Sequence, residues 1–319
     1  MRVTSNLFSE SFKSQLQYLQ ERQMHFQNQI STGLKISKAS DSPVGFQTAQ
    51  IAGEQRYATN SYLNATGEAI ATANYVHEAT TDLQRLMSRA YEIGMRCTNV
   101  YAGDQLKAMS EEMTGIISQV PDVANRQKGG TYLFGGTSNQ ASITVTSGTP
   151  TSYAYNAGTN SQTMKMEIAK SNTVEISMLA GRPGAGGFSG FLVPTSTATF
   201  DTSAATSDID ALSALINLRD TLSAGQPIVP TQNSMVALKN CMDKSTEFVG
   251  KSAARLAGLT LNQTSLKQQL KTQSDRVNDL TNVSLADAVT DLQKVQLHYE
   301  GAIQAGAKVL SISLLDYIR

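Results

Sequence analysis

The stretch "QISTGLKISKASDSPVGF", residues 29–46, interrupts a helical pattern near the start of the chain. Gly33 ends the first pattern, because glycine takes the left-handed conformation found after helix C-termini at little cost. Asp41 or Ser42 can then cap a new helix, with Pro43 at its first position, where the missing N–H has no consequence. The sequence therefore predicts two helices separated by a short connection.

On both sides of this connection, apolar residues recur at steps of three and four, which is typical of a helix with one apolar stripe. The first stripe, with the polar Gln23 inside it, consists of Phe12, Leu16, Leu19, Phe26 and Ile30. The second pattern predicts a helix from Pro43 to about Val100. At 1.5 Å per residue this helix would be roughly 85 Å long, which is too long for a globular domain.

A third helix is predicted from Asp104 to about Lys128, and Pro121 is expected to kink or break it. The sequence then changes character. The segment "KGGTYLFGGTSN", residues 128–139, places a short apolar run between two Gly-Gly pairs. This arrangement is typical of a short strand between tight turns.

Residues 138–204, here called the insertion, are rich in Ser, Thr, Gly and Asn. Two runs of alternating apolar residues predict a β-hairpin within it: Met164, Met166 and Ile168, then Val174, Ile176 and Met178. The segment "GRPGAGGFSG", residues 181–190, lacks the Gly-Lys-Ser/Thr of a phosphate-binding loop. We expect it to be a connecting loop.

Helical periodicity returns near Asp208 and breaks at "GQPIVP", residues 225–230. A longer series then runs without a fault from Met235 to Leu280. After a step of five, a last series follows, with Ser284 and Asp287 as a capping-box pattern at the joint. This last series consists of Leu285, Val289, Leu292, Gln296, Tyr299, Ile303, Gly306 and Leu310.

The first and last interruptions lie at similar distances from the two ends of the chain, so we expect the two terminal helices to pair. The predicted fold class is mainly α with a small β insertion: a long antiparallel helical bundle or coiled coil, with the insertion at its far tip. The predicted domains are a terminal coiled-coil domain (1–42 with 281–319), a long helical domain (43–137 with 205–280) and the β-rich insertion (138–204).

Charge and hydropathy exclude several functions. The chain has 26 basic and 26 acidic side chains, so no overall charge steers it to nucleic acid or to an anionic membrane. No run of about 18 apolar residues predicts a transmembrane helix. The first residues lack the apolar core of a cleaved signal peptide. We expect either a cytosolic protein or one exported without such a signal.

Candidate chemical groups are scattered. His25, His77 and His298 match no metal-binding spacing, and neither do Cys97 and Cys241. Buried free thiols are expected, with a disulfide as the less favoured alternative. No acid, base, nucleophile or metal constellation appears, so the sequence predicts a non-enzymatic protein without cofactor or metal. Four arginines are candidates for subunit contacts or for a solvated helix face: Arg85, Arg89, Arg96 and Arg126.

The opening stretch is similar to the N-terminal signature of the flagellin and flagellar hook-associated protein family. "GGTYLFGGT", residues 129–137, and the ending "LSISLLDYIR", residues 310–319, resemble the family's hook–filament junction members. The resemblance covers about the first 140 and the last 90 residues. The chain departs from the pattern in reading Asp-Ser-Pro, where Asp-Asp-Pro is usual, and in having two cysteines.

The resemblance implies a structural protein of the extracellular bacterial flagellum. Family members are exported unfolded through the flagellar type III export apparatus, and a cytosolic chaperone binds their C-terminal region. A junction member forms a ring of eleven copies between hook-associated protein 1 and flagellin. In the family, the paired termini form domain D0, the long helices D1 and the insertion D2. The alternatives are flagellin itself or, in another class, a surface adhesin acting through the insertion.

The terminal stripes are the predicted assembly surface, because two slender helices with polar positions in their seams would be marginally stable alone. We therefore expect these helices to be disordered in the monomer and to fold when neighbouring subunits cover them. The predicted interface residues are Phe12, Leu16, Leu19, Phe26, Ile30, Leu285, Val289, Leu292, Tyr299, Ile303, Leu310 and Leu314.

Overall fold

The computed structural model describes residues 2–97, 103–146, 152–155, 163–178, 211–226 and 233–317 of the chain. In this part the protein is mainly helical, with three small two-stranded sheets. It divides into two compact units, described in turn. The terminal unit comprises Met1–Ala58 and Gln268–Arg319, and the central unit comprises Thr59–Lys267. Helices α2 (Pro43–Arg96) and α5 (Asn233–Thr281) contribute residues to both.

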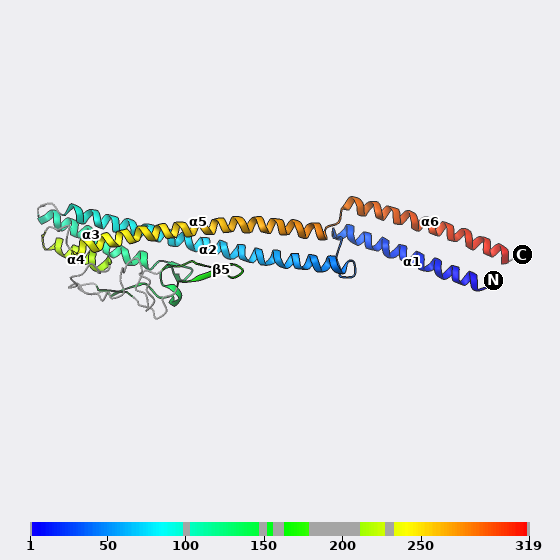
Figure 1. The fold of residues 1–319 in the computed structure, drawn as a ribbon, viewed down its shortest axis with the longest axis horizontal. Coiled ribbons are helices and arrows are strands. Elements are labelled where there is room, and N and C mark those ends of the chain that lie inside the picture. Colours follow the sequence, from blue (N-terminus) through cyan, green and yellow to red (C-terminus); the bar gives the residue numbers. More distant parts are fainter. Residues whose placement is uncertain are drawn as a thin grey trace. The chain divides into compact units, whose positions relative to one another are not determined.

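In the terminal unit, helix α1 (Arg2–Thr32) packs against helix α6 (Leu285–Tyr317). Figure 1 shows the two helices side by side, with both chain ends at the same end of the pair. The helices are therefore antiparallel, which confirms the predicted pairing of the terminal segments.

The first interruption has the predicted helix end. Gly33 has a φ of 71°, and its N–H donates to the carbonyl oxygen of Gln29 at 2.8 Å. This left-handed residue ends α1 as glycine commonly does. Of the two candidate caps for α2, Ser42 is the one that acts, since its Oγ accepts the N–H of Gly45 at 3.2 Å.

Asp41 instead shapes the connection that precedes α2. Its Oδ2 accepts the backbone N–H groups of Ser37 and Lys38, both at 3.0 Å, and the Ser37 hydroxyl at 3.1 Å. The backbone hydrogen bonds to the carboxylate lower the pKa of Asp41, because they stabilise its charged form.

The two interruptions lie against each other. The Lys35 N–H donates to the Thr281 carbonyl at 2.7 Å, and the Val283 N–H donates to the Gly33 carbonyl at 3.0 Å. These bonds form a short antiparallel bridge centred on Leu34 and Asn282. Both helical interruptions thus lie beside each other, and backbone N–H and C=O groups that the helices leave unpaired there bond across the bridge.

At the second interruption, α5 ends at Thr281 and α6 begins at Leu285, close to the predicted joint. The Oγ of Ser284 accepts the N–H of Asp287 at 3.4 Å, which is one of the two hydrogen bonds of a capping box. Asp287 also lies in the first turn of α6, where a negative charge interacts favourably with the helix dipole.

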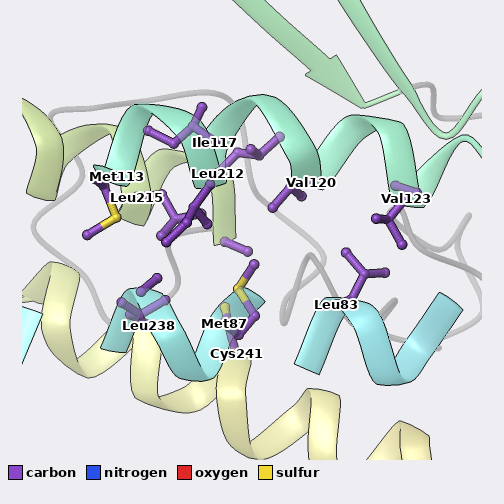
Figure 2. Packing of buried hydrophobic residues seen from close by; sticks show 14 of the residues in the cluster. Leu83, Met87, Met113, Ile117, Val120, Val123, Leu212, Leu215, Leu238 and Cys241 are labelled. Atoms are coloured by element: carbon purple, nitrogen blue, oxygen red, sulfur yellow. The ribbon is translucent and has the colours of Figure 1, made fainter. Parts of the chain in front are cut away.

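The central unit is built around a core to which α2 and α5, together with α3 (Gly103–Ala124) and α4 (Ala211–Ser223), all contribute. Figure 2 shows side chains of these four helices pointing toward one another. Members that are at most 1% exposed include Leu83, Met87, Met113, Ile117, Leu212, Leu215, Leu238 and Cys241.

Two predicted helix ends differ from the structure. Helix α3 continues through Pro121 but stops at Ala124, not near Lys128. Residues Gln127–Lys128 form strand β1 instead, paired with strand β2 (Thr131–Tyr132). Helix α2 ends at Arg96, and the predicted turn at residues 101–105 lies partly outside the described residues.

The apolar run of residues 132–134 begins in a short strand that follows a tight turn, as predicted. Gly129 and Gly130, with φ values of 59° and 82°, form the turn between β1 and β2. After β2 comes a short 3-10 helix, η1 (Gly136–Ser138), and between them Leu133 and Phe134 enter the central core. The short apolar run therefore ties the sheet to the helices.

In the described part of the insertion, the predicted hairpin is confirmed. Strand β5 (Lys165–Ala169) pairs antiparallel with β6 (Asn172–Glu175). A second hairpin, which the sequence analysis missed, pairs β3 (Ile143–Thr146) with β4 (Ser152–Tyr155). The glycine-rich segment 181–190 and the predicted helix start near residue 208 lie outside the described residues.

The described part of the insertion packs on the helices of the central unit. Ile143 and Met178 belong to the main core, and the β5–β6 hairpin lies on α2 near Ala69 and Ala73. The division of the chain into three domains stays a prediction.

Candidate assembly surface

Two contacts between α1 and α6 define the register of the pair. Gly306 of α6 lies against the ring of Phe12, so close that an added Cβ would come within 2.7 Å of the Cε1 atom. About two turns further along each helix, the Nε2 of Gln20 donates to the hydroxyl of Tyr299 at 3.0 Å. Glycine at position 306 thus allows a close approach of the two helices.

The inner face of α6 follows a heptad pattern. Ala288 and Val295 are each 3% exposed, and Gly306 is also buried. Leu292, Tyr299 and Ala302 are half-buried and complete the steps of four and three. On α1, Leu19 is buried, and four of the predicted interface residues are half-buried: Phe12, Leu16, Phe26 and Ile30.

A second apolar stripe on α6 faces solvent. Leu285, Val289 and Ile303 are 55%, 41% and 44% exposed. At 3.6 residues per turn, they lie about 60° to 100° around the helix from Ala288. We call these three residues the α6 flank. Leu310 and Leu314 lie in α6, but their side chains are outside the described residues.

The predicted stripe of α6 therefore straddles two faces. Leu292 and Tyr299 take part in the pairing with α1, whereas the flank residues do not. The sequence analysis missed Ala288 and Val295 because its series started from Leu285 and stepped past both positions, to Val289 and to Gln296. The heptad that joins these two to Ala302 was the pattern that could have found them.

Helix α1 also exposes large side chains. Tyr18 and Met24 are each 57% exposed. The guanidinium carbon of Arg22 lies 5.9 Å from the ring centroid of Tyr18 and 5.5 Å from that of Phe26, within the range of cation–π attraction. Both helices of the pair thus expose some large apolar side chains, and α1 also exposes the aromatic ring of Tyr18.

The other predicted residues have roles within the chain. Cys97 and Cys241 are both buried in the central core as thiols that no disulfide joins, as expected, and burial raises the pKa of Cys97. Arg85 and Arg126 both pair with Asp82, and Arg89 pairs with Glu112.

The histidines are also accounted for where the structure places them. His25 shares a 2.9 Å hydrogen bond with Gln29, and His77 shares one of 2.8 Å with Ser252. Among the described residues, no group of three or more His, Cys, Asp or Glu side chains could hold a metal ion. None of the described helices is long and apolar enough to cross a membrane.

Known proteins resemble the chain in sequence and in fold. No family model matches the chain. Flagellar hook-associated protein 3 of Salmonella typhimurium is 22% identical over 181 residues, which is 54% of each chain. The match thus spans about half the length of this relative.

Solved structures share the fold. One, assigned as a flagellar hook-associated protein from Vibrio parahaemolyticus, aligns with a TM-score of 0.59 at 14% identity over 76% of this chain and all of its own. Hook-associated protein 3 from Legionella pneumophila aligns with a TM-score of 0.55 at 12% identity, over 72% and 98% of the two chains.

The fold and the exposed α6 flank define a mainly helical protein with paired termini and a small β-rich insertion. The comparisons confirm the resemblance to the flagellin and hook-associated protein family. The chain is similar in sequence to flagellar hook-associated protein 3, and its fold is similar to that of a solved hook-associated protein 3.

Proposed function

We propose that this chain is a non-enzymatic structural component of the bacterial flagellum. It assembles as a ring, of eleven copies by family resemblance, that joins the hook, through hook-associated protein 1, to the flagellin filament. The observation that carries the proposal is the α6 flank, which stays 41% to 55% exposed although the inner face of α6 is already filled by α1.

Exposed apolar stripes favour contact with another protein surface. In a ring, each copy presents two different surfaces, one to each neighbour, and the rotation between copies closes the circle. The α6 flank and the exposed Tyr18 and Met24 of α1 offer apolar surface on both helices of the pair. In the proposed ring, the neighbouring copies of the chain cover this apolar surface.

Assembly through these helices also explains how the subunit stays monomeric before it reaches the flagellum. The inner faces of α1 and α6 contain few fully buried residues, among them Leu19 and Val295. Helices with so little tertiary packing are marginal in water. An unfolded end suits a chain that is exported through the type III apparatus with a chaperone on its C-terminal region, and it folds when neighbours cover it.

The test replaces a flank residue in the only copy of the gene. Ile303→Asp places a charge on the exposed flank, and Gln293→Asp places the same charge at an exposed polar position of α6 as the control. We expect cells with Ile303→Asp to build hooks, to lack filaments and to release flagellin into the medium. The control cells are expected to swim.

Leu292→Asp tests the inner face in the same cells. We expect a soluble monomer with an unchanged central unit that does not enter the flagellum. Filament growth of normal length with either Ile303→Asp or Leu292→Asp as the only copy would contradict the proposal.

A further inference from the structure

One section of the α2–α5 pair in the central unit is held together by small and polar side chains. Here Ala69 and Ala73 of α2 are fully or almost fully buried. Four hydrogen bonds cross between the helices: Thr66 to Asn262 at 3.4 Å, His77 to Ser252 at 2.8 Å, Thr80 to Ser252 at 3.3 Å and Gln84 to Thr246 at 3.1 Å.

Such a seam fixes the alignment of two helices better than it stabilises them. Polar groups at seam positions specify register at a cost in stability. Alanine side chains remove little apolar surface from water, and hydrophobic stabilisation scales with that surface. In contrast, the next part of α2 contributes large core residues such as Leu83 and Met87. The section of α2 from residue 66 to residue 73, which contributes no residue to the main core, therefore depends on a third partner.

The β5–β6 hairpin is this partner. Ile168 and Ile176 of the hairpin segment are each 4% exposed and form a cluster with Ala69, Ala73 and Leu259. The half-buried side chains that pack around this cluster are Ile70, Met164, Met166, Val174 and Leu256. The cluster is separate from the main core of the central unit.

The half-buried Arg255 fastens the hairpin segment to α5. The Nη1 of Arg255 donates to the carbonyl oxygen of Ser177 at 3.2 Å, and its Nη2 lies 3.5 Å from the Oε2 of Glu175. The Arg255 side chain is only 21% exposed. The hydroxyl of Ser177 in turn accepts the N–H of Met164, at 2.7 Å. The arginine therefore contacts the end of the hairpin opposite its turn, where this hydrogen bond joins the two flanking segments.

We propose that the β5–β6 hairpin is a detachable clamp, which holds α2 and α5 together between residues 66–73 and 256–262 when it is docked. When the hairpin is pulled away, this section of the helix pair opens while the main core stays folded. Contact or load on the insertion is thereby coupled to the pairing of the long helices.

The contacts explain why the clamp can release without unfolding the unit. Its apolar cluster is small and separate, so its loss leaves the main core intact. The crossing hydrogen bonds of the section join hydroxyl, amide and imidazole groups, which water can satisfy when the helices part. A conformational switch needs two discrete packings, and the structure shows the docked one.

Hydrogen exchange measured by mass spectrometry on the full chain tests the proposal. Arg255→Gln removes the charged group that contacts the hairpin segment, and Ile176→Asp replaces one of its two buried isoleucines with a charged residue. Arg276→Gln, at an exposed arginine of the same helix, is the matched control. We expect amide exchange at residues 66–73 and 256–262 to accelerate roughly tenfold in the two clamp variants, as local opening becomes easier. Exchange at residues 83–96 and 106–124 should be unchanged.

Two results would overturn the clamp. In the first, exchange accelerates at residues 165–176 but stays unchanged in the helical section, which would show that the hairpin only decorates the helices. In the second, exchange rises equally throughout the central core, which would show that the hairpin belongs to one cooperative unit. The milder Arg255→Gln variant keeps the experiment decisive if Ile176→Asp fails to fold.

Discussion

The terminal and central units use similar helical patterns in different ways. Among the residues whose side chains the structure describes, 39 apolar residues are buried. Four of them belong to the terminal unit, and the other 35 belong to the central unit. The four are Leu19, Ala52, Ala288 and Val295.

The exposed apolar residues show the opposite distribution. Of fourteen large apolar side chains that are exposed in the described structure, nine lie in the terminal unit and five in the much longer central unit. A regular apolar period therefore predicts a helix in both units, but it does not tell whether a residue is covered by its own chain. In the central unit it is, whereas in the terminal unit much of the stripe is left for neighbours.

The largest effect is expected from a cavity in the central core. Phe134 is 2% exposed and is among the largest fully buried side chains. Phe134→Ala should lower the free energy of unfolding of the central unit by about 3–5 kcal/mol, because the lost ring leaves a cavity. Urea denaturation followed by circular dichroism measures it. Val145→Ala, at a 44% exposed position, should stay within about 0.5 kcal/mol. Equal effects of the two would contradict the assigned core.

Next in size is a pair of glycine substitutions in α6. Gly306→Ala pushes a methyl group into the ring of Phe12, whereas an added Cβ at Gly301 meets no atom within 4 Å. We expect Gly306→Ala to weaken the α1–α6 pair by about 1–3 kcal/mol through overpacking. Gly301→Ala should strengthen α6 by about 0.5–1 kcal/mol, because alanine favours the helix.

The measurement is the midpoint temperature at which assembled subunits of each variant dissociate on heating. The midpoint should fall for Gly306→Ala and rise or stay level for Gly301→Ala. A rise for both would mean that Phe12 does not pack against Gly306 in the assembly.

A smaller effect is expected at the start of α2. Ser42→Ala removes the hydroxyl that accepts the Gly45 N–H, so it should cost about 1 kcal/mol of local stability. Ser284→Ala removes a longer capping bond of 3.4 Å at the start of α6 and should cost less. Amide exchange in the first turn of each helix measures both. A larger cost at Ser284 than at Ser42 would reverse the assignment of the stronger cap.

The smallest predicted effect is pH-dependent and lies in the central unit. Lys244 and Lys251, at 2.8 and 2.6 Å, lower the pKa of Glu247 from 4.5 to about 2. The depressed pKa in the folded state means that the ion pairs stabilise fully above pH 4.5. This stabilisation is lost as the pH falls toward 2. Because all three side chains are about 40% to 60% exposed, we expect only a few tenths of a kcal/mol.

Glu247→Gln should therefore flatten the fall in stability between pH 4.5 and pH 2, measured by urea denaturation at each pH. Glu111→Gln, at an exposed position of α3, is the control. An unaltered slope for Glu247→Gln would show that these ion pairs do not contribute in solution.

Local chemistry explains which features could be predicted from the sequence. Gly33, Ser42 and Pro43 act within one helical turn of themselves, so the two helix ends at the first interruption were predicted, with Asp41 and Ser42 as alternative caps for the second helix. The β5–β6 hairpin was equally local, because alternation and turn lie within a dozen residues. The pairing of the termini followed from the symmetry of the two interruptions.

Features that depend on distant partners could not be predicted in this way. Helix α3 stops at Ala124, and the side chain of the next residue, Asn125, forms hydrogen bonds with the backbone of β3. Its Oδ1 accepts the Ile143 N–H at 3.0 Å, and its Nδ2 donates to the Ile143 carbonyl at 2.7 Å. Similarly, the inner face of α6 is set by the position of α1, so Ala288 and Val295 are buried while the larger Leu285 is not.

The central claim is that α1 and α6 depend on neighbouring subunits for their stability, whereas the central unit does not. Hydrogen exchange on the full chain as a dilute monomer, compared with the assembled flagellar structure, tests it most directly. We predict that residues 12–30 and 285–306 exchange rapidly in the monomer and become protected on assembly, while residues 83–96 are protected in both states. Protection of residues 12–30 in the monomer as strong as that of residues 83–96 would contradict the account.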